Sequence, residues 1–271
     1  MLSNPVLAGM RVGKILIGMV HVGALPGTPA GTQSLEALAA AARADACAYR
    51  DAGFDAIMVE NMHDVPYVRT PGPEIVAALT RLCGEVRGLG LPTGVQVLAG
   101  ANREALAIAL AADLAFVRVE GFVYAHIADE GLIEACAGEL LRYRRQIGAA
   151  HIAVFADIKK KHCSHAITSD VDSAETARTA EFFGADGVIV TGCRTGVAPS
   201  FEDLQGVRAA VAVPVLVGSG VSVENLPVLM PAADAFIVGS AAKIAGRWSN
   251  PVCPERVRGL VRAFRQADGR G

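Results

Sequence analysis

Eight short apolar segments recur along the chain, and each is followed by a longer segment with the composition of a helix. The short segments are apolar at successive positions, which is typical of strands buried on both faces of a parallel sheet. Eight such units predict a closed (β/α)8 barrel, the TIM barrel, in which a ring of helices surrounds eight parallel strands. The predicted strands are residues 15–20, 56–60, 94–98, 115–119, 151–156, 187–191, 215–217 and 235–238.

The length and composition agree with one such barrel. The chain has 271 residues, of which 52% are apolar and 19% are charged, and no linker-like stretch divides it. A domain of this size buries about 70–75% of the surface that its unfolded chain exposes. We therefore expect residues 1–13 to be an N-terminal lead-in and residues 14–271 to form a single α/β barrel domain.

Charge and hydropathy argue against several classes of function. The net charge of −2 gives no broad basic surface for nucleic acid, and no segment approaches the about 18 consecutive apolar residues of a membrane span. The N-terminal residues lack the basic start of a signal peptide, and the six cysteines show no Cys-x-x-Cys spacing, which indicates reduced thiols. We expect a cytoplasmic protein that does not bind nucleic acid, has no transmembrane segment and, from its architecture, forms a homo-oligomer.

The stretch from residue 214 to residue 243 predicts a phosphate site. Two apolar runs there end in Gly218-Ser219-Gly220 and in Gly239-Ser240. Glycine lets the backbone approach an anion closely, and serine hydroxyls and free N–H groups donate hydrogen bonds to it. In (β/α)8 barrels the loops after the seventh and eighth strands, with a short extra helix, hold phosphate. A helix that begins at Ser240 would be that extra helix.

Other residues near these turns are candidates for the same anion site. Lys243 falls in the first helical turn after Ser240, where its ammonium could neutralise a phosphate. Thr191 and Gly192 begin a third glycine-rich turn, which continues through Arg194 and Thr195. A phosphate contact and a plain mobile loop are both open for that turn.

Several predicted strands end in a polar residue that lies two positions beyond an apolar residue of the same parity, as in Ile17, Met19 and His21. Side chains of one parity point into a barrel, and its chemistry lies at the C-terminal ends of the strands. Ionisable groups that converge over an apolar interior are costly unless they pair or serve a ligand. We therefore predict a site built from His21, Glu60, Gln96, Arg118, Glu120, Asp157, Lys159 and Lys161.

The segment from Asp157 to His162 contains three consecutive lysines and is the richest in candidate catalytic groups. A desolvated lysine beside other cations has a lowered pKa and acts as a nucleophile, including in Schiff-base chemistry, or as a base; Asp157 would orient it. The alternative is a solvated basic loop. Alternation along the strand favours Lys159 and Lys161 as the inward lysines but does not choose between them.

Glu60 is a candidate general base or metal ligand, with an ion pair to Arg118 or Lys159 as the structural alternative. His21 and His162 are candidate proton-transfer groups, and Glu120 is a candidate of the same kind. No zinc-ligand spacing is present. No cofactor is required by the sequence, although Mg²⁺ held by a carboxylate and a substrate phosphate stays open.

Several motifs resemble the BtpA/SgcQ family over about residues 14–264: GMVHVGALPG from residue 18, Glu60-Asn61, ADIKKKH from residue 156, VLVGSGV from residue 215 and IVGS from residue 237. The resemblance implies a TIM barrel related to phosphate-binding barrels, and it favours Lys161 among the lysines. One branch of the family is named from photosystem I biogenesis and another from a sugar-utilisation gene cluster. Residues 96–102 and Glu120 depart from the photosynthetic branch, so the chain looks more similar to the other branch.

These observations predict an enzyme that acts on a small phosphorylated sugar or nucleoside-type metabolite. Asp157, Lys161 and Glu60 would carry the acid–base chemistry, with His21 or His162 assisting. An assembly or biogenesis factor that uses the barrel to bind a partner protein is the alternative. A metal-dependent hydrolase is the third option.

Overall fold

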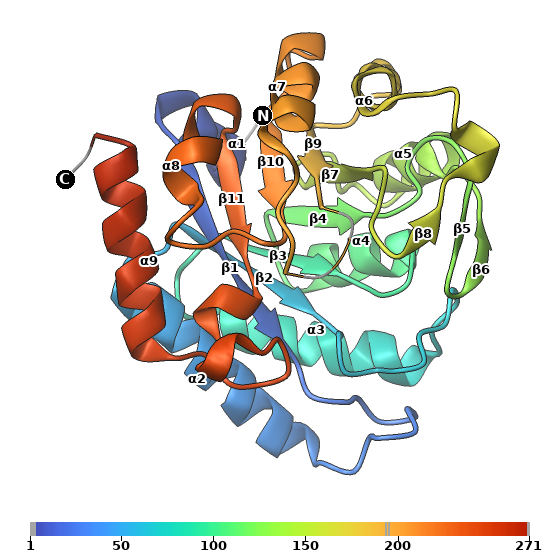
Figure 1. The fold of residues 1–271 in the computed structure, drawn as a ribbon. Coiled ribbons are helices and arrows are strands. Elements are labelled where there is room, and N and C mark those ends of the chain that lie inside the picture. The colour runs from blue at the N-terminus through green and yellow to red at the C-terminus, as the bar shows by residue number, and fades with distance from the viewer. Residues whose placement is uncertain (1–3, 193, 195, 270–271) are drawn as a thin grey trace.

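The computed structural model describes residues 4–192, 194 and 196–269, and Figure 1 shows their fold. Eight parallel strands close into a barrel in the order β1-β11-β10-β9-β7-β4-β3-β2, which confirms the predicted TIM barrel. The barrel strands are β1 (Ile15–His21), β2 (Ala56–Glu60), β3 (Thr93–Gln96), β4 (Phe116–Val119), β7 (Ala153–Ile158), β9 (Gly187–Val190), β10 (Val215–Gly218) and β11 (Ala235–Val238).

Helices connect the strands and surround the barrel. Ser34, Asp172 and Ser200 each precede a helical stretch of the sequence, which predicts them as capping residues. The structure confirms this, because the side chain of each accepts a hydrogen bond from a backbone N–H in the first turn. The helices are α2 (Leu35–Ala52), α3 (Pro73–Arg87), α4 (Asn102–Ala111), α5 (Ala137–Gln146), α6 (Ser173–Phe182), α7 (Phe201–Ala210), α8 (Leu226–Leu229) and α9 (Pro254–Ala267). Short 3₁₀ turns occupy Ala166–Thr168, Met230–Ala232, Ser240–Ala242 and Ile244–Gly246.

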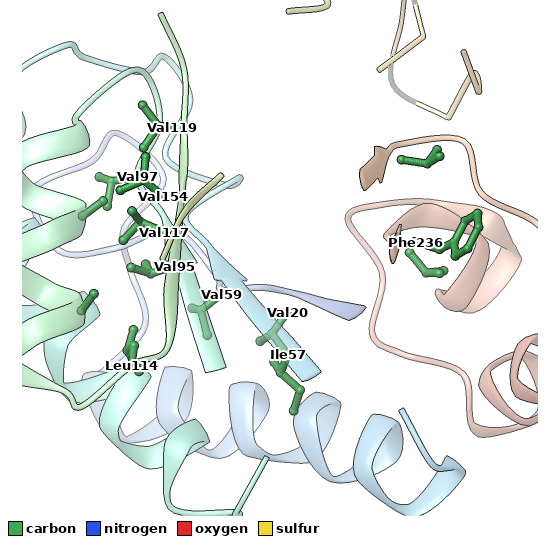
Figure 2. Close-up of a cluster of buried hydrophobic side chains, with 14 of the residues drawn as sticks. Val20, Ile57, Val59, Val95, Val97, Leu114, Val117, Val119, Val154 and Phe236 are labelled. Carbon is green, nitrogen blue, oxygen red and sulfur yellow. The ribbon is translucent and has the colours of Figure 1, made fainter. Parts of the chain in front are cut away.

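Side chains at alternate positions of each strand point to opposite faces of the sheet and form two separate apolar layers. Residues such as Val20, Val59 and Val117 face the surrounding helices, and Figure 2 shows part of this layer. Residues such as Ile17 and Met58 face the barrel interior. Along each strand, the positions that face the barrel interior lead to the polar residue at the strand end. The predicted meeting of these polar side chains therefore follows from the alternation of side chains along each strand.

A helix that the sequence prediction missed, α1 (Pro5–Val12), covers the N-terminal end of the barrel. The Asn4 side chain caps this helix and also donates hydrogen bonds to the carbonyls of Ala115 and His151, which precede two barrel strands. Val6 and Met10 are buried against the interior residues. Residues 1–13, which we predicted to be a lead-in, therefore contain the helix that closes the N-terminal end of the barrel.

The helical composition of residues 130–147, with arginines toward the C-terminal end, predicts a helix, but a small antiparallel sheet replaces its first part. Its strands are β5 (His126–Ala128), β6 (Gly131–Ile133) and β8 (Cys163–Ser164), and Figure 1 shows them on the side of the barrel opposite α9. Gly131 adopts a left-handed φ of 98°, which supports the tight turn of a hairpin and not a helix. The following helix, α5, begins only at Ala137.

Among the described residues, no helix has the length and apolar character that crossing a bilayer needs. Five cysteines carry free thiols: Cys47, Cys83, Cys136, Cys163 and Cys253. The sixth, Cys193, lies outside the described residues.

Candidate functional site

A cavity of about 230 Å³ opens at the C-terminal ends of the barrel strands. Its walls combine two Gly-Ser turns with a dense set of ionisable side chains. The lining residues are Met19, His21, Glu60, Met62, Tyr67, Gln96, Leu98, Arg118, Glu120, Asp129, Glu130, Lys160, Lys161, His162, Ser219, Gly220, Ile237, Gly239 and Ser240. Eleven of the residues predicted from the sequence are among them.

Strand register brings the first polar residues side by side. His21 of β1 pairs with Glu60 of β2, and Glu60 pairs with Gln96 of β3. Glu60 and Gln96 are buried. Their adjacency is a consequence of parallel pairing in a closed barrel, in which residues far apart in sequence share one layer.

His21 and Glu60 place two titratable side chains close together in the cavity wall. The Nδ1 atom of His21 lies 2.9 Å from the backbone carbonyl of Trp248. Because a carbonyl only accepts, Nδ1 carries the hydrogen, and the Nε2 lone pair of the neutral ring faces Glu60 Oε2 at 3.4 Å. Burial, followed by the nearby Lys243 charge, lowers the pKa of His21 to about 3.

Burial also raises the pKa of Glu60, while the nearby Arg118 and Lys161 charges oppose the rise. The carboxylate is therefore the stronger base of the pair with His21. A proton that binds to one of these two side chains therefore binds to Glu60 in preference to the His21 imidazole.

Arg118 and Asp157 form a buried bidentate ion pair. Arg118 Nε donates to Asp157 Oδ2 at 2.9 Å, and Nη2 donates to Oδ1 at 3.0 Å. The Asp157 side chain is 0% exposed, and Asp157 does not line the main cavity. The alternative ion pair between Arg118 and Glu60 does not form, and Asp157 instead fixes the direction of the guanidinium.

Glu120 is held by three donors. Its carboxylate accepts hydrogen bonds from Gln96 Nε2, from the backbone N–H of Gly100 and from Lys160 Nζ, each at 3.0 Å. Burial raises its pKa, and Lys160 opposes that rise. Three donors on one carboxylate favour a fixed charged group, so Glu120 is better placed to orient neighbours than to exchange protons.

The three consecutive lysines have three different environments. Lys159 Nζ donates to the Thr168 carbonyl at 2.8 Å and lies in a smaller cavity behind the site, whereas Lys160 binds Glu120. Lys161 lines the main cavity and makes no hydrogen bond or ion pair with the residues that the structure describes. The parity prediction for Lys159 is wrong because its φ of 47° ends the alternation of the strand.

The two Gly-Ser turns reach the cavity through Ser219-Gly220 and Gly239-Ser240. The predicted extra helix at Ser240 is a single 3₁₀ turn, Ser240–Ala242, which is too short to supply a helix dipole. An anion at this wall would be held by hydroxyl and backbone N–H groups and by the cationic side chains that line the same cavity, Arg118, Lys160 and Lys161. Ser219 itself accepts a hydrogen bond from the Gly196 N–H, which ties the preceding rim loop to this turn.

The prediction that Lys243 contacts the ligand is also corrected. Its ammonium is fully buried and donates to Asp45 Oδ2 at 2.7 Å, beneath the Gly239-Ser240 turn and not in the cavity. Asp45 Oδ1 accepts from the Val252 N–H as well. Lys243 therefore anchors the segment after β11 to α2.

Three further predicted residues support the rim without lining the cavity. A Cβ on Gly192 would lie 2.2 Å from the Val197 carbonyl oxygen, and one on Gly218 would lie 2.5 Å from Ile189 Cγ2, so both positions serve close packing. Thr191 lies beside Gly218, and its buried hydroxyl has no partner among the described residues. Thr195, which we considered for phosphate, lies outside the described residues.

The structure adds residues that sequence reasoning missed. The hairpin between β5 and β6 carries Asp129 and Glu130 to the cavity, and Tyr67 reaches it from the loop after β2. The Trp248 carbonyl selects the His21 tautomer. None of these residues stands at the end of a barrel strand, so the strand-end rule could not find them.

No group of three or more His, Cys, Asp or Glu side chains is arranged to hold a metal ion within the described residues. A Mg²⁺ site that uses one carboxylate and a substrate phosphate needs no such group. The Mg²⁺ option therefore stays a prediction, and Glu60 and the hairpin carboxylates are the oxygen ligands that this cavity offers.

Comparisons with solved structures agree with the fold. The chain is similar to (S)-3-O-geranylgeranylglyceryl phosphate synthase from Thermoplasma acidophilum, solved with sn-glycerol-1-phosphate, with a TM-score of 0.60 and 18% identity over 98% of this chain and 100% of that one. It is also similar to tryptophan synthase from Mycobacterium tuberculosis, with a TM-score of 0.60 and 20% identity over 98% and 97% of the two chains. At these identities the likeness concerns the fold alone.

Sequence relatives share most of their length with this chain. An uncharacterised mitochondrial protein of Caenorhabditis elegans is 48% identical over 90% of each chain, and one of Pyrococcus horikoshii is 40% identical over 92% and 95%. The photosystem I biogenesis protein BtpA of Synechocystis is 36% identical over 92% of this chain and 87% of that protein. The sequence profile of the BtpA family matches residues 12–266. The chain belongs to the BtpA family, as its motifs predicted.

Proposed function

We propose that this member of the BtpA family is an enzyme that acts on a small phosphorylated sugar or nucleoside-type metabolite by acid–base chemistry. The observation that carries the proposal is that one cavity holds both Gly-Ser turns and the His21–Glu60 pair. The turns suit a phosphate, and the pair suits proton transfer to or from the rest of the ligand. The phosphorylated ligand of the Thermoplasma synthase, which has the same fold, supports this use of the barrel.

The cavity also offers acceptors for hydroxyl groups. Gln96 Oε1 and Glu130 Oε2 are buried atoms with no hydrogen-bond partner among the described residues, and both residues line the cavity. A buried acceptor without a partner is costly, and a ligand hydroxyl would satisfy it. A polyhydroxylated metabolite such as a sugar phosphate supplies donors at one end and an anion at the other.

The alternative function is a biogenesis factor that binds a partner protein; the Synechocystis relative is named a photosystem I biogenesis protein. Such a factor gains nothing from burying charged side chains at the C-terminal end of the barrel, because each buried charge is costly unless it is paired. The buried pairs Arg118–Asp157 and Lys160–Glu120 therefore favour the enzyme.

A thermal-shift screen of the purified protein against phosphorylated metabolites, with and without Mg²⁺, tests the proposal. A true ligand at about 100 times its Kd adds roughly 2.7 kcal/mol to the free energy of unfolding, which raises the Tm by about 5 °C or more. Gly239→Ala should abolish this shift. A methyl group there would meet His21 Cε1 at an ordinary contact distance of 3.6 Å and would occupy cavity space.

Gly206→Ala is the matched control, because its Cβ, in α7, would meet nothing within 4 Å. It should keep the ligand shift in full. If no phosphorylated compound stabilises the wild-type protein, or if Gly239→Ala keeps the shift, the phosphate site proposed here is wrong.

A further inference from the structure

Lys161 is the cavity lysine whose ammonium is left available for chemistry. Of the three consecutive lysines, Lys159 donates to the Thr168 carbonyl and Lys160 donates to Glu120. Lys161 has no such bond to the described residues, although its side chain is enclosed by the cavity. A lysine that only stabilised the fold would be expected to bind a carboxylate or a carbonyl, as its two neighbours do.

The surroundings of Lys161 favour the neutral amine. Burial lowers its pKa, and the Arg118 charge lowers it further, while Glu60, Asp157 and Glu120 act in the opposite direction. Two of these carboxylates already have close cationic partners, Asp157 with Arg118 and Glu120 with Lys160. A lysine with a lowered pKa presents more of its free lone pair near neutral pH than an exposed lysine does.

We propose that Lys161 is a covalent nucleophile and that the phosphorylated substrate carries an aldehyde or ketone group, with which Lys161 forms a Schiff base. This inference rests on the proposed function, because the same cavity binds the phosphate. The Gly-Ser turns would hold the phosphate, and Lys161 would meet the carbonyl carbon. Open-chain sugar phosphates have both groups.

The chemistry balances with the groups in the cavity. The Nζ lone pair attacks the carbonyl carbon, and the proton that the attacking nitrogen loses moves to the carbonyl oxygen to give a carbinolamine. A second proton, delivered by Glu60, lets that oxygen leave as water, and a C=N bond replaces the C=O bond. The positive nitrogen then acidifies the adjacent C–H, and the Glu60 carboxylate is the base that removes its proton. No oxidant or reductant takes part.

Hydride trapping tests this step without knowledge of the physiological reaction. The intact protein is incubated with cyanoborohydride and each of dihydroxyacetone phosphate, glyceraldehyde 3-phosphate, ribose 5-phosphate and glycolaldehyde. The reductant converts a Schiff base into a stable secondary amine, which adds the mass of the ligand less one oxygen atom. The chain has only five lysines, Lys14, Lys159, Lys160, Lys161 and Lys243, so peptide mass spectrometry assigns the adduct unambiguously.

We expect one adduct, on Lys161, which is lost in Lys161→Arg and in Lys161→Gln. Lys159→Arg is the control, because Lys159 lies outside the main cavity, and it should be labelled as the wild type is. The trapping rate should also reach half its maximum at a lower pH for Lys161 than for a free lysine derivative. Circular dichroism of each variant checks that it is folded.

The outcomes separate this inference from the proposed function. If phosphorylated compounds raise the Tm but no adduct forms on Lys161, the nucleophile is wrong and the phosphate site stands. Glycolaldehyde has no phosphate, so its adduct on Lys161 without any thermal shift by phosphorylated compounds would support the nucleophile and overturn the phosphate site. Equal labelling of Lys14, at the far end of the barrel, would show unselective reaction and overturn the inference.

Discussion

The two ends of the barrel interior are built by the same strands but contain opposite chemistry. At the N-terminal end, Ile15 and Phe116 form an apolar layer that is sealed by Val6 and Met10 of α1. At the C-terminal end the next positions of the same parity are charged, as with Glu60 and the residues around it. The strands are continuous, so the change occurs within one or two residue pairs.

This difference shows which part of the interior is explained by stability alone. Burial of apolar surface stabilises the fold by about 25 cal/mol per Å² and needs no ligand. Buried charges destabilise it unless each has a partner, and even paired ones are often replaceable by apolar residues without loss. The C-terminal end of the barrel therefore retains its charged side chains for a purpose other than folding, and substitutions at the two ends should have different effects.

The largest effect is expected from Asp157→Ala, which leaves the Arg118 guanidinium buried without its partner. Removing one member of a buried pair costs about 3–5 kcal/mol, which urea denaturation would measure. The double variant Arg118→Leu/Asp157→Leu should recover most of this loss. Glu85→Ala, which breaks an exposed pair with Arg43, is the control and should cost less than about 1 kcal/mol. Equal losses of stability in Asp157→Ala and Glu85→Ala would mean that the buried Arg118–Asp157 pair contributes no more than an exposed pair.

A smaller effect is expected at the opposite end from Met10→Ala. Met10 is buried against the interior residues, and removing such a side chain costs about 2–3 kcal/mol through lost burial and the cavity left behind. The Tm shift produced by a phosphorylated ligand should be the same as in the wild type, because α1 is at the other end of the barrel. A Met10→Ala protein that is less stable and has also lost the ligand shift would contradict this division between the two ends.

The smallest expected effect is a pH dependence of the free energy of unfolding that arises at the C-terminal end of the barrel alone. Because the pKa of His21 is lowered from 6.5 to about 3, the unfolded chain takes up a proton that the folded chain refuses as the pH falls below 6.5. Stability therefore falls toward acid, by about 1 kcal/mol between pH 6.5 and 5.5. His21→Gln should remove this part of the loss when unfolding is measured at the two pH values.

Glu60 acts with the opposite sign, since its raised pKa contributes stability that is present below its unfolded value and is lost as the pH rises through the folded one. The difference between wild type and His21→Gln isolates the histidine. His151→Gln, at an exposed position next to α1, is the matched control and should leave the pH dependence unchanged. An unchanged slope in His21→Gln would show that His21 is not held neutral.

Most of the fold and about half of the site could be predicted from alternation along the strands. The parity rule placed His21, Glu60 and Arg118 in one layer because a β-strand leaves its side chains little choice of face. It failed at Lys159, where the backbone leaves the strand conformation with a positive φ. It also could not reach Glu130, because a hairpin took the place of an expected helix.

The sequence by itself determined the eight-stranded barrel, its family and the layer of polar strand ends, because these depend on periodic patterns and on motifs within short segments. Only the tertiary structure decided which charges pair with which. Asp157 binds Arg118 and Lys243 binds Asp45, over 39 and 198 residues of sequence. Pairing depends on distances across the closed barrel and on the end of each strand, and these are fixed by packing and not by local pattern. Lys161 is left available because Asp157 and Glu120, two of the nearby carboxylates, already bind Arg118 and Lys160.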